Sequence, residues 1–154
     1  MNPYQDYANL MTKSVNHIFQ TLLNDQSLRE IYDSSLREKE DSLKVAVEFK
    51  GTLRGEIVIL FSKKTLTEIA KVFFSGTSSR VSKKMREDVA GELANLITGT
   101  FANQIQYLQH DILLSPPEIN NDPIQIKALY DNINVPFESS FGKFEVDLFF
   151  KKGD

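Results

Sequence analysis

The hydrophobic residues of this 154-residue chain change their spacing along the sequence, and this change constrains the fold more than any other feature. In residues 4–23 and 82–108, apolar side chains recur every three or four positions, which is typical of amphipathic helices. In residues 43–49 they alternate with other side chains, which is typical of a half-buried strand. We therefore expect helices packed against a sheet.

Turn residues divide the chain into further elements. Glycines at both ends of residues 51–55 predict a turn, so residues 43–49 and 56–61 are expected to form a hairpin. Thr65 and Glu68 have the spacing of a capping box, which opens a helix that we expect to end at Gly76. Four later strands are predicted, at residues 112–114, 124–130, 133–137 and 143–151.

The order of these elements predicts the fold class. Residues 26–41 are rich in charge and are expected to form an exposed connection, with a short strand around Ile31 and Tyr32. The whole order suits an α+β fold of two layers, in which long helices pack on one mostly antiparallel sheet. The length predicts a single domain over residues 1–154.

Composition excludes several classes of function. The chain has no cysteine, so it has neither disulfides nor thiolate metal sites. No stretch approaches the ~20 apolar residues that a membrane-spanning helix needs. The net charge of −3 argues against nucleic acid as a partner, and neither His17 nor His110 belongs to a zinc-binding pattern. We expect a soluble, cytoplasmic protein that binds neither nucleic acid nor membrane.

A second stripe runs along the helix predicted at residues 82–108, away from its apolar face. At 100° per residue, six side chains lie within about ±40° of one line. These are Asp88, Glu92, Asn95, Gly99, Ala102 and Gln106. A glycine inside a helix costs roughly 0.8–1.0 kcal/mol relative to alanine. The stripe is either an indifferent solvated face or a surface whose small residues let another molecule approach Glu92 and Asn95.

Residues 91–99, with the sequence GELANLITG, resemble the signature helix of the CheX/CheC family of chemotaxis phosphatases. In that family an Asp or Ser is followed by Glu four residues later and by Asn three residues after that, as in Asp88, Glu92 and Asn95. Pro117 follows near the position of the family's proline. Three other segments resemble the family's first hairpin and closing strands, namely residues 49–55, 136–139 and 142–144. A single strong motif resembles CheX more than CheC, which usually carries two sites.

The resemblance implies a phosphatase that acts on the phosphorylated aspartate of a CheY-like response regulator. It implies that Asn95 positions the attacking water and that Glu92 pairs with a lysine of the regulator. The other stripe residues are expected to contact the regulator, namely Asp88, Gly99, Ala102 and Gln106. The chain is expected to hold no metal or cofactor of its own, Mg²⁺ being supplied with the regulator, and to form a homodimer.

Other interpretations stay open at this point. One is a binding module that docks a response regulator or another signalling protein without hydrolysis. Another is an assembly role, in which the C-terminal strands pair across a homodimer, their apolar alternation being that of Phe144, Val146, Leu148 and Phe150. The basic residues before the motif are either a solvated first turn or a docking patch for an acidic partner, and they comprise Arg80, Lys83, Lys84 and Arg86.

The N-terminal helix contains an echo of the motif. Residues 6–12 read DYANLMT, and residues 92–98 read ELANLIT. Asn2 stands where the motif has an acid or Ser, and Lys13 stands where the long helix has Gly99. We therefore predict that Asp6 and Asn9 do not form a second site.

Overall fold

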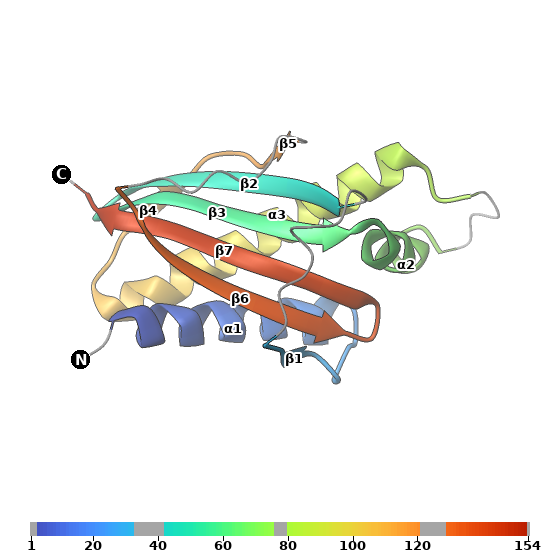
Figure 1. Cartoon of the computed structure of the whole chain (residues 1–154), viewed down its shortest axis with the longest axis horizontal. Coiled ribbons are helices and arrows are strands. Elements are labelled where there is room, and N and C mark those ends of the chain that lie inside the picture. Colours follow the sequence, from blue (N-terminus) through green and yellow to red (C-terminus); the bar gives the residue numbers. More distant parts are fainter. Residues whose placement is uncertain (1–2, 33–41, 76–79, 121–128, 154) are drawn as a thin grey trace.

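The computed structural model describes residues 3–32, 42–75, 80–120 and 129–153. It confirms the predicted α+β class, with helices lying against an antiparallel sheet (Figure 1). The helices, in chain order, are α1 (Pro3–Leu22), α2 (Lys63–Phe73), α3 (Lys83–Ile105) and the 3₁₀ turn η2 (Gln106–Leu108). The strands are β1 (Arg29–Glu30), β2 (Ser42–Gly51), β3 (Leu53–Ser62), β4 (Ile112–Leu114), β5 (Glu118–Asn120), β6 (Asp131–Ser139) and β7 (Gly142–Lys152).

The described strands form one sheet in the order β1-β6-β7-β3-β2-β4, and β5 also pairs with β2. All the pairs are antiparallel. The predicted hairpin of β2 and β3 is confirmed, with Val47 opposite Ile57. The C-terminal strand β7 lies between β3 and β6, near the centre of the sheet.

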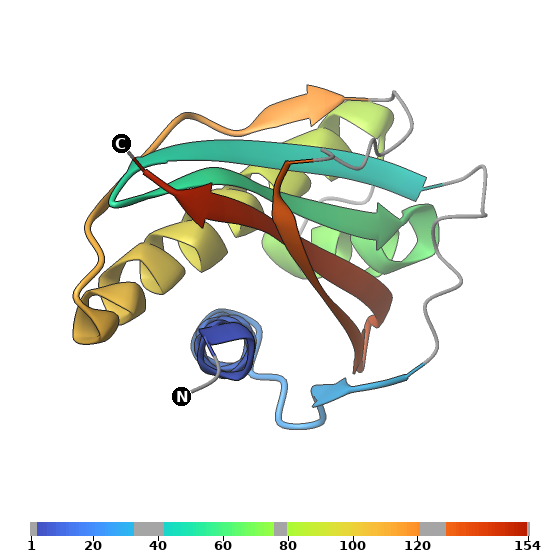
Figure 2. The same cartoon turned by 60° about the vertical axis from the view of Figure 1, so that its left-hand side comes forward.

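The hydrophobic core lies between the sheet and the helices. Figure 2, in which α1 is viewed end-on, shows α1 and α3 side by side on one face of the sheet. The alternating apolar side chains of three strands are buried in this core, and they include Val45, Val47, Ile57, Ile59, Phe144, Val146 and Leu148. Burial of each such side chain contributes about 1.5–3 kcal/mol, which fixes the strand register and the faces that the helices turn inward.

The tip of the first hairpin is tighter than the sequence predicted. Only Thr52 separates β2 from β3, instead of a turn over residues 51–55. Gly51 has φ of 149°, and a Cβ on it would lie 2.1 Å from the carbonyl oxygen of Asp111. The Thr52 N–H donates to that same oxygen over 3.0 Å. The tip therefore holds the segment before β4 against the edge of β2.

Helix α2 begins earlier than predicted. Its N-cap is Ser62, whose hydroxyl oxygen accepts the Thr65 N–H over 3.1 Å, so the predicted capping box from Thr65 to Glu68 is wrong. The helix follows β3 without a loop, so its first free N–H groups lie next to Ser62. The Thr65 hydroxyl instead donates to the carbonyl of Lys143 over 2.8 Å. The predicted stop at Gly76 lies outside the described residues.

The remaining differences concern short strands. The strand expected around Ile31 and Tyr32 is β1, which ends one residue earlier, and β5 was not predicted. Most of the strand predicted at residues 124–130 lies outside the described residues, and Leu129 and Tyr130 lie in a turn and bend. Such short edge strands have too few residues to show an alternation of their own.

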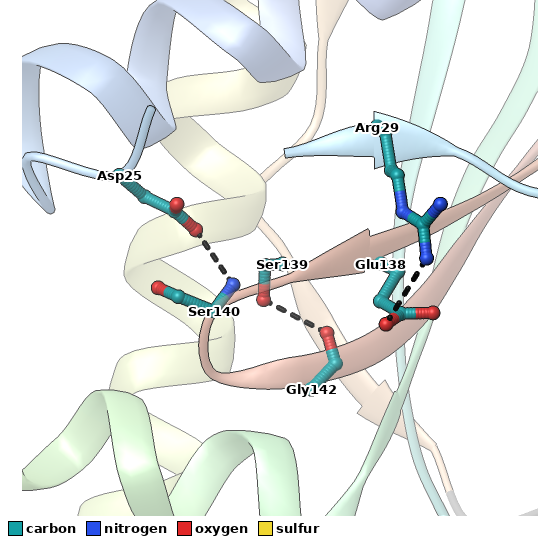
Figure 3. A network of polar contacts seen from close by, with 6 residues as sticks. All are labelled: Asp25, Arg29, Glu138, Ser139, Ser140 and Gly142. Carbon is teal, nitrogen blue, oxygen red and sulfur yellow. Dashed lines mark hydrogen bonds and ion pairs between the residues drawn. The ribbon is translucent and has the colours of Figure 1, made fainter. Parts of the chain in front are cut away.

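Polar contacts tie the end of α1 to the turn between β6 and β7 (Figure 3). Asp25 is buried, and its carboxylate accepts the Ser140 N–H over 3.0 Å and the Ser27 N–H over 2.9 Å. Burial alone raises the pKa of this carboxyl, but the hydrogen bonds from Ser140 and Ser27 outweigh it, so the pKa of Asp25 lies below its ordinary value. These contacts fix the position of α1.

Candidate functional site

Packing fixes the rotation of α3 about its own axis. Ser82 caps its start by accepting the Met85 N–H over 3.1 Å. Its buried side chains are Val89, Ala90, Leu93, Ala94, Ile97, Thr98, Phe101 and Ile105. This buried face is broad, because α3 contacts both α1 and the sheet. Leu96, Thr100 and Gln104, at the border of this face, are only half-buried.

The stripe predicted from helical spacing lies opposite this buried face. Asp88, Glu92, Asn95 and Gln106 are exposed, and Gly99 and Ala102 are half-buried. The side chains of Glu92 and Asn95 make no hydrogen bond or ion pair with any other residue in the described part of the chain. An exposed carboxylate and an exposed carboxamide, one helical turn apart, are thus both available to another molecule.

Asp88 is engaged differently from the other two polar residues of the motif. Its carboxylate forms an ion pair with Lys84, at a distance of 3.2 Å, and both side chains are largely exposed. Of the other basic residues before the motif, Arg80 and Lys83 are exposed, whereas Arg86 donates to the carbonyl of Val81 over 3.2 Å. The first turns of α3 thus use part of the cluster for local contacts.

The mid-helix glycine of the stripe is not required by the fold. A Cβ on Gly99 would meet no atom within 4 Å apart from its immediate surroundings in the helix. Packing therefore gives no reason for a residue that weakens the helix by roughly 0.8–1.0 kcal/mol. The space above Gly99 is open to an approaching surface.

A shallow groove of about 490 Å³ runs along this side of the molecule. Its α3 wall contains Asn95, Gly99 and Ala102, together with Leu96, Thr100 and Asn103. Its other wall is β4, with Ile112, Leu113 and Leu114. Sequence analysis missed these β4 residues because nothing in the sequence relates a three-residue strand to a face of a helix. Pro117, the residue resembling the family's proline, is half-buried in the connection from β4 to β5.

The two histidines do not belong to this groove. His110 is half-buried, with ring nitrogens 3.0 Å from the Tyr7 hydroxyl and 3.0 Å from the Thr52 hydroxyl. Burial lowers the pKa of His110 below its ordinary value, and each ring nitrogen has a hydroxyl as its partner. His17 is exposed on α1. Among residues 3–32, 42–75, 80–120 and 129–153, no three His, Asp or Glu side chains are grouped as a metal site would require.

Comparison with known proteins places this geometry in a family. The family model described as chemotaxis phosphatase CheX matches residues 43–138, which is more than half of the chain and includes all of α3 and β4. The CheY-P phosphatase CheX of Thermotoga maritima is 22% identical over 108 residues, which make up 70% of this chain and 69% of that protein.

Solved structures share the fold. The chemotaxis protein CheX from Vibrio vulnificus matches with a TM-score of 0.78 and 17% identity, over 98% of this chain and 100% of that one. A CheX from Borrelia burgdorferi, in a complex with CheY, BeF3 and Mg²⁺, matches with a TM-score of 0.71 and 15% identity, over 95% of this chain and 98% of that one. The chain therefore belongs to the CheX family of chemotaxis phosphatases.

Proposed function

We propose that the Glu92–Asn95 face of α3 removes the phosphoryl group from the phosphoaspartate of a CheY-like response regulator. The observation that carries this proposal is the pair of exposed side chains without partners in the described structure, one turn apart, beside the open space at Gly99. The names of two relatives support the substrate, since one is a CheY-P phosphatase and the other was solved in a complex with CheY.

Asn95 orients the attacking water in this proposal. Its carboxamide both donates and accepts hydrogen bonds, so it holds one water in a fixed direction. The water oxygen bonds to phosphorus as the bond from phosphorus to the aspartate oxygen breaks, which releases inorganic phosphate and restores the carboxylate. An amide does not act as a general base at neutral pH, so its contribution is positioning.

Glu92 docks the helix on the regulator. Its carboxylate pairs with the lysine that receiver domains carry near their phosphorylation site, and this contact sets the register of Asn95. Gly99, Ala102 and Gln106 extend the contact along the same line of α3. Asp88 supports the start of the helix through Lys84 and contacts the edge of the regulator.

The divalent cation belongs to the regulator. The described residues of this chain offer no group of metal-ligating side chains, and the CheX complex from Borrelia burgdorferi contains Mg²⁺ together with CheY. When bound, Mg²⁺ supplies charge stabilisation to the transferring phosphoryl group.

The proposal also includes a cytoplasmic location and a homodimer. No helix in the described part of the chain combines the length and the apolar character needed to cross a membrane. Dimerisation through β7 is wrong, because β3 and β6 occupy both of its edges and Phe144, Val146 and Leu148 lie in the core. The outer edge of β6 is the candidate, since among the described residues β1 covers only its end near Phe137. Size-exclusion chromatography with light scattering tests for twice the mass of 17.6 kDa.

The decisive experiment is a dephosphorylation assay. CheY-type receiver domains are phosphorylated with acetyl phosphate, and phosphate release is followed with and without this protein. Accelerated release from at least one regulator supports the proposal. Tight binding to the phosphorylated regulator with no acceleration contradicts it and favours the alternative, a module that docks without hydrolysis.

A further inference from the structure

The groove beside Asn95 has two walls of different origin. On α3 it is lined by Asn95, Gly99 and Ala102, which the motif had already singled out. On the opposite side it is lined by β4, a strand that follows α3 after a short connection and pairs with the edge of β2. A surface that reaches Asn95 along this groove therefore meets β4 as well.

Leu113 is the unusual residue of β4. It is 70% exposed, because strand alternation turns it, together with its β2 neighbour Lys50, to the face of the sheet away from the core, whereas Ile112 is buried and Leu114 is half-buried against the core. Leu113 also lines a second, smaller depression of about 340 Å³ that includes Glu48, Lys50 and Ser115. The pairing of Leu113 with Lys50 holds the strand in place, so the exposed leucine is presented on a fixed element and loses little freedom when it is covered.

We propose that β4 is the second wall of the docking surface for the response regulator, and that Leu113 makes an apolar contact which determines affinity for that regulator. This proposal rests on the proposed function. The occupant follows from continuity, because Asn95 and Leu113 line one groove.

The arrangement specifies the partner's chemistry. Glu92 precedes Gly99 by seven residues and Ala102 by ten, which corresponds to about 10–15 Å along the helix axis. The fitting surface carries a lysine for Glu92, small or flat contacts over Gly99 and Ala102, and an apolar side chain that covers Leu113 at the edge of β4.

The test measures the rate of phosphate release as a function of the concentration of a CheY-type receiver domain phosphorylated with acetyl phosphate. Leu113→Ala shortens the side chain, Leu113→Thr keeps a residue that favours strands, and Leu113→Met preserves an apolar side chain of similar volume. The matched control is Leu129→Ala, because Leu129 is 82% exposed and does not line this groove. Thermal unfolding of each variant verifies the fold.

We expect KM to rise roughly tenfold in Leu113→Ala and Leu113→Thr, with kcat within about twofold of the parent value, because an apolar docking contact acts mainly on binding. Leu113→Met and Leu129→Ala keep the parent KM. An unchanged KM in both Leu113→Ala and Leu113→Thr overturns the inference, and so does a rise of equal size in Leu129→Ala.

The two proposals fail separately. If the parent protein does not accelerate phosphate release, the proposed function fails. If the parent is active and Asn95→Ala is not, but every Leu113 variant has the parent KM, the role of β4 fails while the proposed function stands.

Discussion

Residues 6–12 of α1 and residues 92–98 of α3 share four of seven residues, yet the structure gives the two segments different surroundings. In α3, Glu92 and Asn95 are exposed, and their side chains have no partner among the described residues. In α1, Asp6 is half-buried, and the Asn9 amide oxygen accepts a hydrogen bond from Gln5 over 3.0 Å. The side-chain amide of Asn95 is thus available to another molecule, whereas that of Asn9 is already hydrogen-bonded within α1.

The grooves beside the two asparagines also differ. Asn95 faces a groove with Gly99 on its own helix and leucines on β4. Asn9 lines a polar groove between α1 and α3, where Lys13 occupies the position that corresponds to Gly99. A long cation therefore stands where α3 leaves open space. The comparison teaches that the residue one turn after the asparagine, Lys13 in α1 and Gly99 in α3, distinguishes a candidate site from an ordinary helix face. The asparagine and its immediate neighbours in the sequence do not.

The largest expected effect comes from Asn95→Ala. We expect the rate of regulator dephosphorylation to fall roughly 10²-fold or more, because loss of a positioned reactant costs about that much. The fold is expected to persist, since the side chain is exposed and alanine favours helix. Phosphate-release kinetics and circular dichroism measure the two quantities. Near-normal turnover by a folded variant would contradict the mechanism.

Charge reversal at Glu92 sharpens the comparison with the half-buried Asp6. Glu92→Lys places like charge against the regulator's lysine, so we expect its affinity to fall more than about tenfold. Glu92→Ala removes one exposed ion pair, for which a loss of roughly two- to fivefold is expected. Fluorescence titration with phosphorylated regulator gives both values. Equal affinities of the two variants and the parent would show that Glu92 lies outside the contact surface.

Asp25 tests the view that the region of α1 holds the fold together while α3 presents the site. In the parent protein the two carboxylate oxygens of Asp25 accept the N–H groups of Ser27 and Ser140. Asp25→Asn leaves only one acceptor oxygen for these two donors, so we expect the free energy of unfolding to fall by about 1–2 kcal/mol. Because the folded-state pKa lies below its ordinary value of 3.8, the charge contributes stability above that pH.

This contribution is lost as pH falls through the folded-state pKa. Urea unfolding between pH 7 and pH 3 should therefore show a difference between parent and Asp25→Asn that narrows at the acid end. If the difference in unfolding free energy between parent and Asp25→Asn does not change with pH, the stability lost in the variant comes from packing and not from the charge of Asp25.

Substitutions of Gly99 are expected to have a smaller effect. They stabilise the helix, and a large side chain at this position weakens docking of the regulator. Gly99→Ala is expected to raise the free energy of unfolding by roughly 0.8–1.0 kcal/mol, because the added Cβ meets no neighbour. Gly99→Leu is also expected to stabilise the helix slightly while it blocks the regulator. Urea unfolding and regulator titration test the pair. Unchanged affinity in Gly99→Leu would mean that the partner does not approach here.

The smallest effect is expected in residues 6–12 of α1, which resemble the motif of α3. Asn9→Ala should leave dephosphorylation essentially unchanged, because the Asn9 amide is already bonded to Gln5 and Lys13 stands one turn away. The activity of the double variant should equal that of Asn95→Ala alone. A halved rate in Asn9→Ala, with activity abolished only in the double variant, would instead establish two working sites.

The sequence by itself determined the long helices and strands, because their hydrophobic pattern repeats many times. Helices of twenty residues or more and strands of nine or more repeat their pattern often enough to fix both the type of element and its buried face. For this reason α1, α3, β2 and β7 were predicted within a few residues, as was the exposure of Glu92 and Asn95. The roles of these two residues stay predictions.

Tertiary structure alone decided how these elements meet. The apolar alternation of β7 suits an edge strand as well as a central one, and only its pairing with β3 and β6 places it inside the sheet. The start of α2 depends on where β3 ends, and the position of β4 depends on contact between Gly51 and Asp111. These outcomes rest on contacts between residues far apart in the chain, which local periodicity does not encode. For the same reason, Leu113 was identified as a candidate contact residue only once the structure placed β4 beside Asn95.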